Sequence, residues 1–355
     1  MTSHIEPDAI LQNIRSRTNF FDPPAAFDPL KASAAELLRY GFSLEPDPVS
    51  APERHASWLR LFSQKLNFVA ADFALPPLPE VRRPGRRRQP VIGRRRHERS
   101  LNWCGAYVAA KQARTLTEIH ADWEVPEPNP PIHPGSGVYI DGEYRSSTWI
   151  GFDGQRRYVN SSLPQIGTAQ DVVVVNGALT RKTYAWIQWW VSDHLSLPVH
   201  IPSLPIKARD RVTCGMVVIN PKKVRFYITN LTTGAFVKPF ELSPPLFHPP
   251  DGREPMQLEV SGATAQWVME RPAALTAGHR LAELANYGEV TFRNCYAVSS
   301  HHGTEEHSES LSGATLINMR ATREHPHRSV IISKSRLEDN QTLITSYTDR
   351  GIAAL

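Results

Sequence analysis

The pattern of hydrophobic residues changes character near residue 100. Before that point, residues 33–41 start with a capping serine and end in glycine, and residues 52–66 repeat large apolar side chains every three or four positions. Both patterns predict short helices. Residues 1–31 are polar and contain Asp-Pro pairs, which disfavour helix, so we expect loose order there. The pattern indicates a partly helical N-terminal region over residues 1–75.

Beyond residue 100 the chain consists of short segments rich in Val, Ile, Thr, Tyr and Trp. Pairs of residues that favour tight turns separate these segments: Asp141-Gly142, Asp153-Gly154, Asn176-Gly177 and Asn220-Pro221. Short β-type segments divided by such turns are typical of an antiparallel sandwich or barrel. We therefore predict an all-β domain over residues 100–355.

Alternation within two of these segments predicts which side chains share a face. In a strand, successive side chains point to opposite faces. Residues 266, 268 and 270 (Gln, Val, Glu) then lie opposite residues 267 and 269 (Trp, Met). Likewise, Trp186, Gln188 and Trp190 lie opposite a purely apolar set at 185, 187, 189 and 191. The mixed polar and aromatic faces indicate a cleft, and the apolar faces indicate a core.

Composition excludes several classes of protein. The 355-residue chain is 41% hydrophobic, and its apolar runs, such as residues 172–175, are far shorter than the roughly 20 residues of a membrane span. We expect no membrane partner. Three scattered cysteines are too few for a disulfide framework, so buried free thiols are expected. The start shows no basic segment followed by an apolar one; the cytoplasm is the default compartment, and secretion would need another export route.

Positive charge is concentrated between the two regions. Residues 82–99 hold nine arginines and one glutamate, a charge of +8, so the total of +5 leaves −3 for the remainder. Residues 76–99 are also rich in proline and read as a linker. The arginines could form a solvated strip, contact phosphate, or mark a processing site that releases residues 100–355 from a pro-segment. Stacking aromatics are not interleaved with them, so we expect no nucleic-acid partner.

Six blocks in the β-rich region follow one another in a recognisable order. They are Asn102-Trp103-Cys-Gly-Ala, Ala121-Asp-Trp-Glu-Val-Pro126, Trp149-Ile-Gly-Phe-Asp-Gly154 with Leu163-Pro-Gln-Ile-Gly167, Tyr184-Ala-Trp-Ile-Gln-Trp-Trp190, Asn230-Leu-Thr-Thr-Gly234 and Ala265-Gln-Trp-Val-Met-Glu270. In this order they resemble the eqolisin family of glutamic peptidases. The resemblance implies a concanavalin A-like sandwich of two antiparallel sheets, with the substrate cleft across the concave sheet.

The resemblance also implies which residues carry the chemistry. Glu270 falls on the catalytic glutamate and Gln165 on the catalytic glutamine, which would make the chain an acid-acting endopeptidase. The substrate-binding residues would be Trp149, Asp153, Trp186, Gln188 and Trp190. A carboxylate and an amide together can activate water, stabilise an oxyanion and protonate the leaving amine, so no metal or other cofactor is required. Peptides or unfolded proteins are the expected substrates, and a monomer is expected.

Two departures and two alternatives accompany this interpretation. Gln188 and Gln266 replace glutamates of the family, which leaves Glu270 with fewer like-charged neighbours. A non-catalytic module that binds carbohydrate or peptide is the main alternative, because this sandwich class also serves lectins. The histidines at 301–307, 325 and 327 could ligate zinc but lack the spacing of a helical His-Glu-x-x-His site, so a polar loop is favoured.

Overall fold

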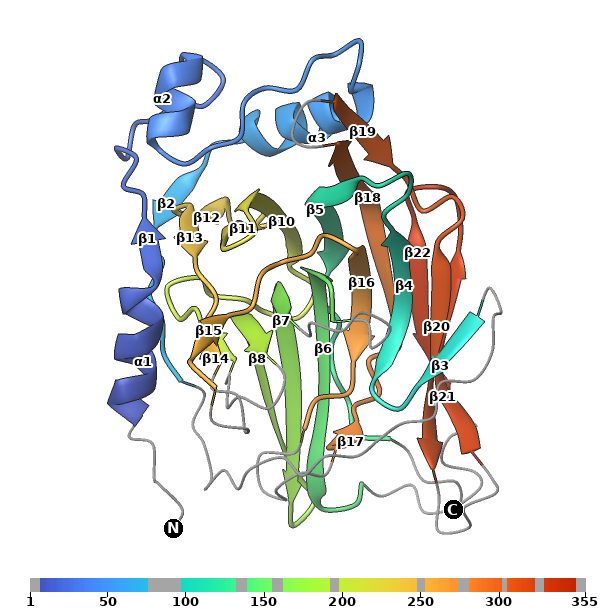
Figure 1. Ribbon diagram of the computed structural model, residues 1–355. Helices are drawn as coiled ribbons and strands as arrows, with labels where there is room; N and C mark the ends of the chain where they lie inside the picture. The colour runs from blue at the N-terminus through green and yellow to red at the C-terminus, as the bar shows by residue number, and fades with distance from the viewer. Residues whose placement is uncertain are drawn as a thin grey trace.

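The structure is a computed structural model that describes most of the chain (Figure 1). The described residues are 7–75, 97–131, 139–154, 162–191, 198–247, 253–273, 281–301, 305–322 and 329–348. Most of the linker predicted at 76–99, together with His325 and His327, lies outside them. The predicted all-β sandwich of two antiparallel sheets is confirmed.

A mixed N-terminal region precedes the sandwich. Its elements are α1 (Pro7–Ser16), β1 (Thr18–Phe20), α2 (Ala34–Arg39), α3 (Pro52–Phe62) and β2 (Asn67–Val69). The two predicted helices are confirmed as α2 and α3. The side chain of Ser33 accepts the backbone N–H of Glu36, and the Glu36 carboxylate accepts the N–H of Ser33, which satisfies two donors at the start of α2.

The expectation of loose order over residues 1–31 is wrong for α1 and β1. Helix α1 forms because Ile10, Leu11 and Ile14 make an apolar stripe that packs on the main core. Strand β1 forms because it pairs with β13, which lies more than 200 residues further along the sequence. Neither tertiary contact is visible in the local polarity of the segment.

The first sheet is built from neighbouring antiparallel strands near the middle and end of the chain. In spatial order these are β19 (Glu305–Glu309), β18 (Glu289–His301), β5 (Thr115–Glu124), β10 (Arg211–Asn220) and β11 (Lys223–Asn230), followed by β12 (Ala235–Val237) and β13 (Phe240–Leu242) side by side along β11. Strand β18 also connects the two sheets, because its first four residues pair with β22 of the second sheet.

The second sheet is wider and also antiparallel. In spatial order its strands are β22 (Leu343–Tyr347), β21 (Ser329–Leu337), β20 (Thr315–Thr322), β4 (Trp103–Ala109), β16 (Thr264–Glu270), β6 (Gly142–Phe152), β7 (Ser162–Val175), β8 (Ala178–Val191) and β9 (Val199–His200). Short parallel strands join it at β20 and β6: β3 (His97–Ser100) and β17 (Glu283–Leu284). A separate hairpin consists of β14 (Leu246–Phe247) and β15 (Met256–Gln257).

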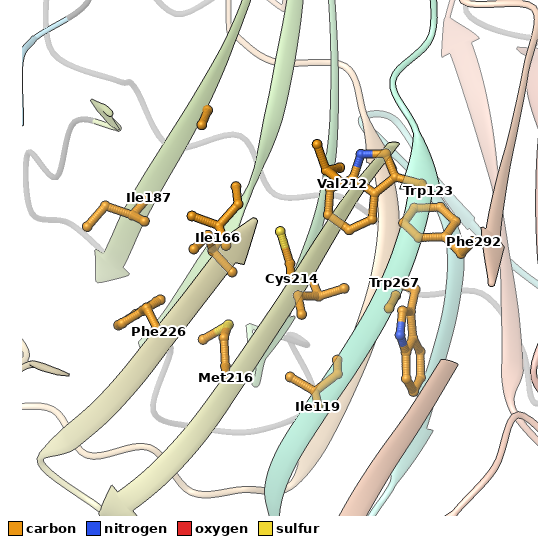
Figure 2. Packing of buried hydrophobic residues seen from close by; sticks show 14 of the residues in the cluster. Ile119, Trp123, Ile166, Ile187, Val212, Cys214, Met216, Phe226, Trp267 and Phe292 are labelled. Carbon is orange, nitrogen blue, oxygen red and sulfur yellow. The ribbon is translucent and has the colours of Figure 1, made fainter. Parts of the chain in front are cut away.

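The main hydrophobic core lies between the two sheets. Figure 2 shows Ile119 and Met216 of the first sheet in one cluster with Ile166, Ile187 and Trp267 of the second. All three cysteines are free and buried, as expected. In the described part of the chain, no helix is long and apolar enough to cross a membrane.

The predicted alternation is confirmed on both faces of the second sheet. Trp267, Met269 and Trp189 belong to the main core. On the opposite face a separate aromatic cluster forms around Trp149 and Trp186. We call this opposite face the cleft face, because it carries the polar and aromatic residues that the alternation assigned to a cleft.

Glycine at one central position of the cleft face allows two neighbouring strands to pair closely. Gly167 in β7 lies directly opposite Trp149 in β6. A Cβ atom at Gly167 would collide with the backbone oxygen of Thr148 and lie 2.6 Å from the Cβ of Trp149. Backbone groups in the middle of a sheet have little freedom to move, so this glycine is needed for the close pairing of β6 and β7 at Trp149.

We therefore predict that Gly167→Ala destabilises the sandwich by about 1–3 kcal/mol, the usual cost of overpacking. Gly215→Ala is the matched control, since its new Cβ would meet nothing nearer than 3.7 Å and it also lies inside a strand. Urea unfolding of both variants measures the free energies. Equal stability of the two variants would contradict this account.

Candidate active site

Strand register places five of the seven predicted site residues in three adjacent rows on the cleft face, and Asp153 and Trp190 lie outside these rows. The first row holds Trp103, Glu270, Ser147 and Ala169; the second holds Val268, Trp149, Gly167 and Trp186; the third holds Gln266, Gly151, Gln165 and Gln188. Glu270 and Gln165 thus share a face but lie two strands and two rows apart. Among the described residues, no hydrogen bond joins them.

Three side-chain N–H groups converge on the carboxylate of Glu270. Its Oε1 accepts from Asn102 Nδ2 at 3.2 Å and from Trp103 Nε1 at 3.1 Å, and its Oε2 accepts from Trp149 Nε1 at 2.8 Å. Trp103 lies opposite Glu270 on β4, and Trp149 comes from the strand on the other side. The carboxylate is therefore held from both neighbouring strands at once.

Burial and hydrogen bonding act in opposite directions on Glu270. Burial raises the pKa of its carboxyl group above the ordinary value of 4.5, because a low-dielectric site disfavours the charged form. The hydrogen bonds from Trp103, Trp149 and Asn102 and the charge of Arg145 lower the pKa, but burial prevails.

Gln165 is buried and only partly satisfied. Its side chain is 3% exposed, and its Nε2 donates to Oε1 of Gln188 at 2.7 Å on the neighbouring strand. Its Oε1 has no hydrogen-bond partner among the described residues. Buried polar atoms are seldom left unpaired, so this oxygen is an acceptor available for a further hydrogen bond.

Asp153 supports a turn beside the site. It has a positive φ of 61° after the end of β6, and its carboxylate accepts from the backbone N–H and hydroxyl of Ser261 at 2.6 and 2.9 Å and from the N–H of Ala263 at 2.9 Å. Its backbone oxygen accepts the amide of Gln266. These contacts hold the turn that leads into β16, and a direct contact of Asp153 with substrate stays a prediction.

Aromatic rings line the rest of the cleft face. Trp149 and Trp103 meet edge to face, with ring centroids 5.3 Å apart. Trp186 is 5% exposed, and its Nε1 has no partner in the described part of the chain. Trp190 packs on the same cluster and is partly exposed. The cleft face therefore carries a largely buried aromatic cluster, with an indole N–H that has no partner among the described residues.

A buried ion-pair network adjoins the Glu270 row. Arg145 Nε donates to Asp171 at 2.8 Å, its Nη1 donates to the backbone oxygen of Ala273 at 2.7 Å, and its Nη2 donates to the hydroxyl of Tyr184 at 3.3 Å. The Tyr184 hydroxyl donates in turn to Asp171 at 2.9 Å. Arg145 precedes Ser147 by two residues on β6, so it faces the same side as Glu270.

The described histidines of the segment 301–307 lie on β18 and β19 of the first sheet, whereas Glu270 and Gln165 lie on the second sheet. His301 ends β18, and His307 on β19 lies 3.2 Å from the carboxylate of Glu305. Within the described ranges, no three His, Cys, Asp or Glu side chains come together as a set of metal ligands.

The sequence analysis assigned no functional role to Asn102 and Trp103, although the pair opens the first block of the resemblance. The structure shows that both side chains donate hydrogen bonds to Glu270.

The model of the Peptidase A4 family matches residues 101–347. No curated protein matches the chain. Among solved structures, scytalido-glutamic peptidase with a peptide-based transition state analogue is 17% identical, with a TM-score of 0.49 over 70% of this chain and 98% of the other.

Two further solved structures are similar. SCP-B, a member of the eqolisin family in complex with the tripeptide Ala-Ile-His, is 17% identical with a TM-score of 0.46 over 70% of this chain and 98% of its own. Aspergilloglutamic peptidase from Aspergillus niger is 20% identical with a TM-score of 0.41 over 58% and 99%. Since the family model spans nearly the whole sandwich, the chain belongs to the Peptidase A4 family and is a hydrolase, a glutamic endopeptidase.

Proposed function

We propose that the protein hydrolyses peptide bonds in acid with Glu270 as general base and Gln165 as its partner, without a metal or a covalent intermediate. The observation that carries this proposal is the carboxylate of Glu270, held by three N–H donors on the same face as a buried glutamine with an unpaired oxygen. A fixed base and a free acceptor on one surface suit the activation of water.

The substrate would lie over the middle row, between Glu270 and Gln165. That row contains Gly167, which has no side chain, beside the indole of Trp149. An extended peptide there would place its scissile bond between the carboxylate on one side and the amide on the other. The two-row separation of Glu270 and Gln165 is then the space that water and substrate fill.

Each atom of the two residues has a role in this mechanism. The ionised Glu270 takes a proton from water as the water oxygen attacks the substrate carbonyl. Gln165 Oε1 accepts from that water, while the Nε2 hydrogen not used by Gln188 donates to the oxyanion. Glu270 then gives its proton to the departing nitrogen, and both residues return to their initial state.

The surrounding side chains would bind the rest of the substrate. Trp149, Trp186 and Trp190 supply rigid apolar area, and the unpaired N–H of Trp186 can donate to a substrate carbonyl. Gln188 holds Gln165 in place and borders the same row. We propose that the monomer acts on peptides or unfolded proteins, whose extended backbone fits a row of this kind.

We predict that Glu270→Gln lowers kcat/KM by roughly 10²–10⁴-fold, because it removes the general base while leaving a side chain of the same shape. Gln165→Ala should also lose most activity. The measurement is hydrolysis of a denatured protein from pH 2 to 7, with circular dichroism to confirm that each variant is folded.

Gln257→Ala is the matched control for this experiment, since it removes an amide from the β14–β15 hairpin outside the site. If Glu270→Gln keeps full activity, the catalytic assignment is wrong. Binding of carbohydrate or peptide by an inactive wild type would instead favour the non-catalytic module.

The pH dependence offers a second test. Trp149→Phe keeps an aromatic ring but removes the N–H that stabilises the ionised carboxylate of Glu270, so the pKa of Glu270 rises further. Activity of a general base falls as the pH drops through its pKa. The acidic limb of the kcat/KM profile should therefore move to higher pH than in the wild type.

Trp189→Phe is the control for this shift, because its indole N–H donates to Ser162 on the core side. Full pH profiles of both variants measure the position of the limb. An unchanged limb in Trp149→Phe would show that a group other than Glu270 controls it.

A further inference from the structure

We propose that residues 7–75 are a permanent structural part of the enzyme and stay bound without covalent attachment when the chain is cut within residues 76–99. The arginine-rich stretch allows such a cut by sequence. The product would then be a two-chain enzyme instead of a free domain of residues 100–355. The proposal rests on packing and does not depend on the catalytic roles of Glu270 or Gln165.

The N-terminal region completes the edge of the first sheet. Strand β1 pairs antiparallel with β13, and β2 pairs in parallel with β12 (Figure 1). Beyond β2, Ala74 exchanges two backbone hydrogen bonds with His200 at the β9 edge of the second sheet. Without residues 7–75, both sheets would present unpaired backbone groups, which favour aggregation.

Buried aromatic side chains join the N-terminal region to the sandwich. Phe42 is fully buried, and its ring lies 5.7 Å from that of Phe236 in β12 and 5.8 Å from that of Phe62 in α3. Phe236 is also fully buried. Removal of the N-terminal region would expose Phe236, so a large apolar area favours association.

The N-terminal region also contributes to the main core. Ile14 of α1 and Phe73, which follows β2, are both members of the cluster between the two sheets. The ring of Phe73 meets that of Phe240 in β13 edge to face, with centroids 5.4 Å apart. Because the N-terminal region supplies side chains to the core, it is part of the folded domain and does not merely pack on the surface of the domain.

Polar contacts fix the same interface at its other end. Arg54 of α3 donates to Glu118 of β5 at 2.7 Å and to Glu306 of β19 at 2.6 Å. The hydroxyl of Tyr227 in β11 donates to the backbone oxygen of Gly41 at 2.8 Å. In Figure 1, α3 lies across the ends of β5 and β18. These contacts set the orientation of the helix on the sheet.

The test uses the full chain with a recognition sequence for a specific protease inserted among residues 82–96. After folding, the chain is cut and passed over a size-exclusion column at pH 7 and at pH 4. We expect both fragments to elute together at the volume of the uncut protein, and to separate only in denaturant. Elution of the large fragment alone in native buffer at either pH would overturn the proposal.

A pair of variants tests the packing itself. In the cut protein, Phe42→Ala should weaken the association of the fragments at least tenfold, whereas Leu38→Ala on the half-exposed face of α2 should leave it unchanged. Equal effects of the two changes would contradict the role of the aromatic cluster. Co-elution of cut wild type is decisive even if Phe42→Ala does not fold, and it is read without any activity measurement.

Discussion

The carboxylate of Glu270 must be satisfied by hydrogen bonds, and much of the second sheet is organised around that requirement. A partly buried charge without partners is costly, and here the partners are side chains from the strands on either side. Both Trp103 and Trp149 reach Glu270 only in the observed register. A slip of one residue in β16 would turn Glu270 into the core and Met269 to the cleft. The site and the strand pairing therefore specify each other.

Glycine extends this dependence to the next strand. Gly167 lies directly opposite Trp149, and a Cβ atom there would collide with the backbone of β6 and with the Cβ of Trp149. The middle row, between the rows of Glu270 and Gln165, therefore has one position without a side chain next to Trp149 and Trp186. Gly167 thus allows the close pairing of β6 and β7 at Trp149, whose indole N–H donates to Glu270. Packing and proposed chemistry meet at this position, which is why a methyl group there would affect both.

The local sequence pattern predicted the features that depend on residues close together in the chain, such as strand faces, tight turns and short helices. The faces of residues 265–270 and 184–190, the turn at Asn176-Gly177 and the helices α2 and α3 all follow from short-range signals. The resemblance supplied Glu270. The partners of Glu270 could not be predicted, because Asn102 and Trp103 reach it through a pairing across more than 160 residues. The order of α1 and the contacts of Asp153 also depend on distant partners, which local polarity does not reveal.

The raised pKa of Glu270 places activity and stability in opposition. A group whose pKa is higher in the folded than in the unfolded state contributes most to stability when protonated, and this contribution is lost as the pH rises through the folded pKa. A general base works only after it has lost that proton. The active form is therefore the one that the fold tolerates less well. The hydrogen bonds from Asn102, Trp103 and Trp149 reduce the conflict, because they stabilise the ionised carboxylate of the partly buried Glu270. Removing any of them would lower the fraction of ionised Glu270 at acid pH and would leave its carboxylate less firmly positioned. The proposed general base therefore depends on these three donors as well as on its own side chain.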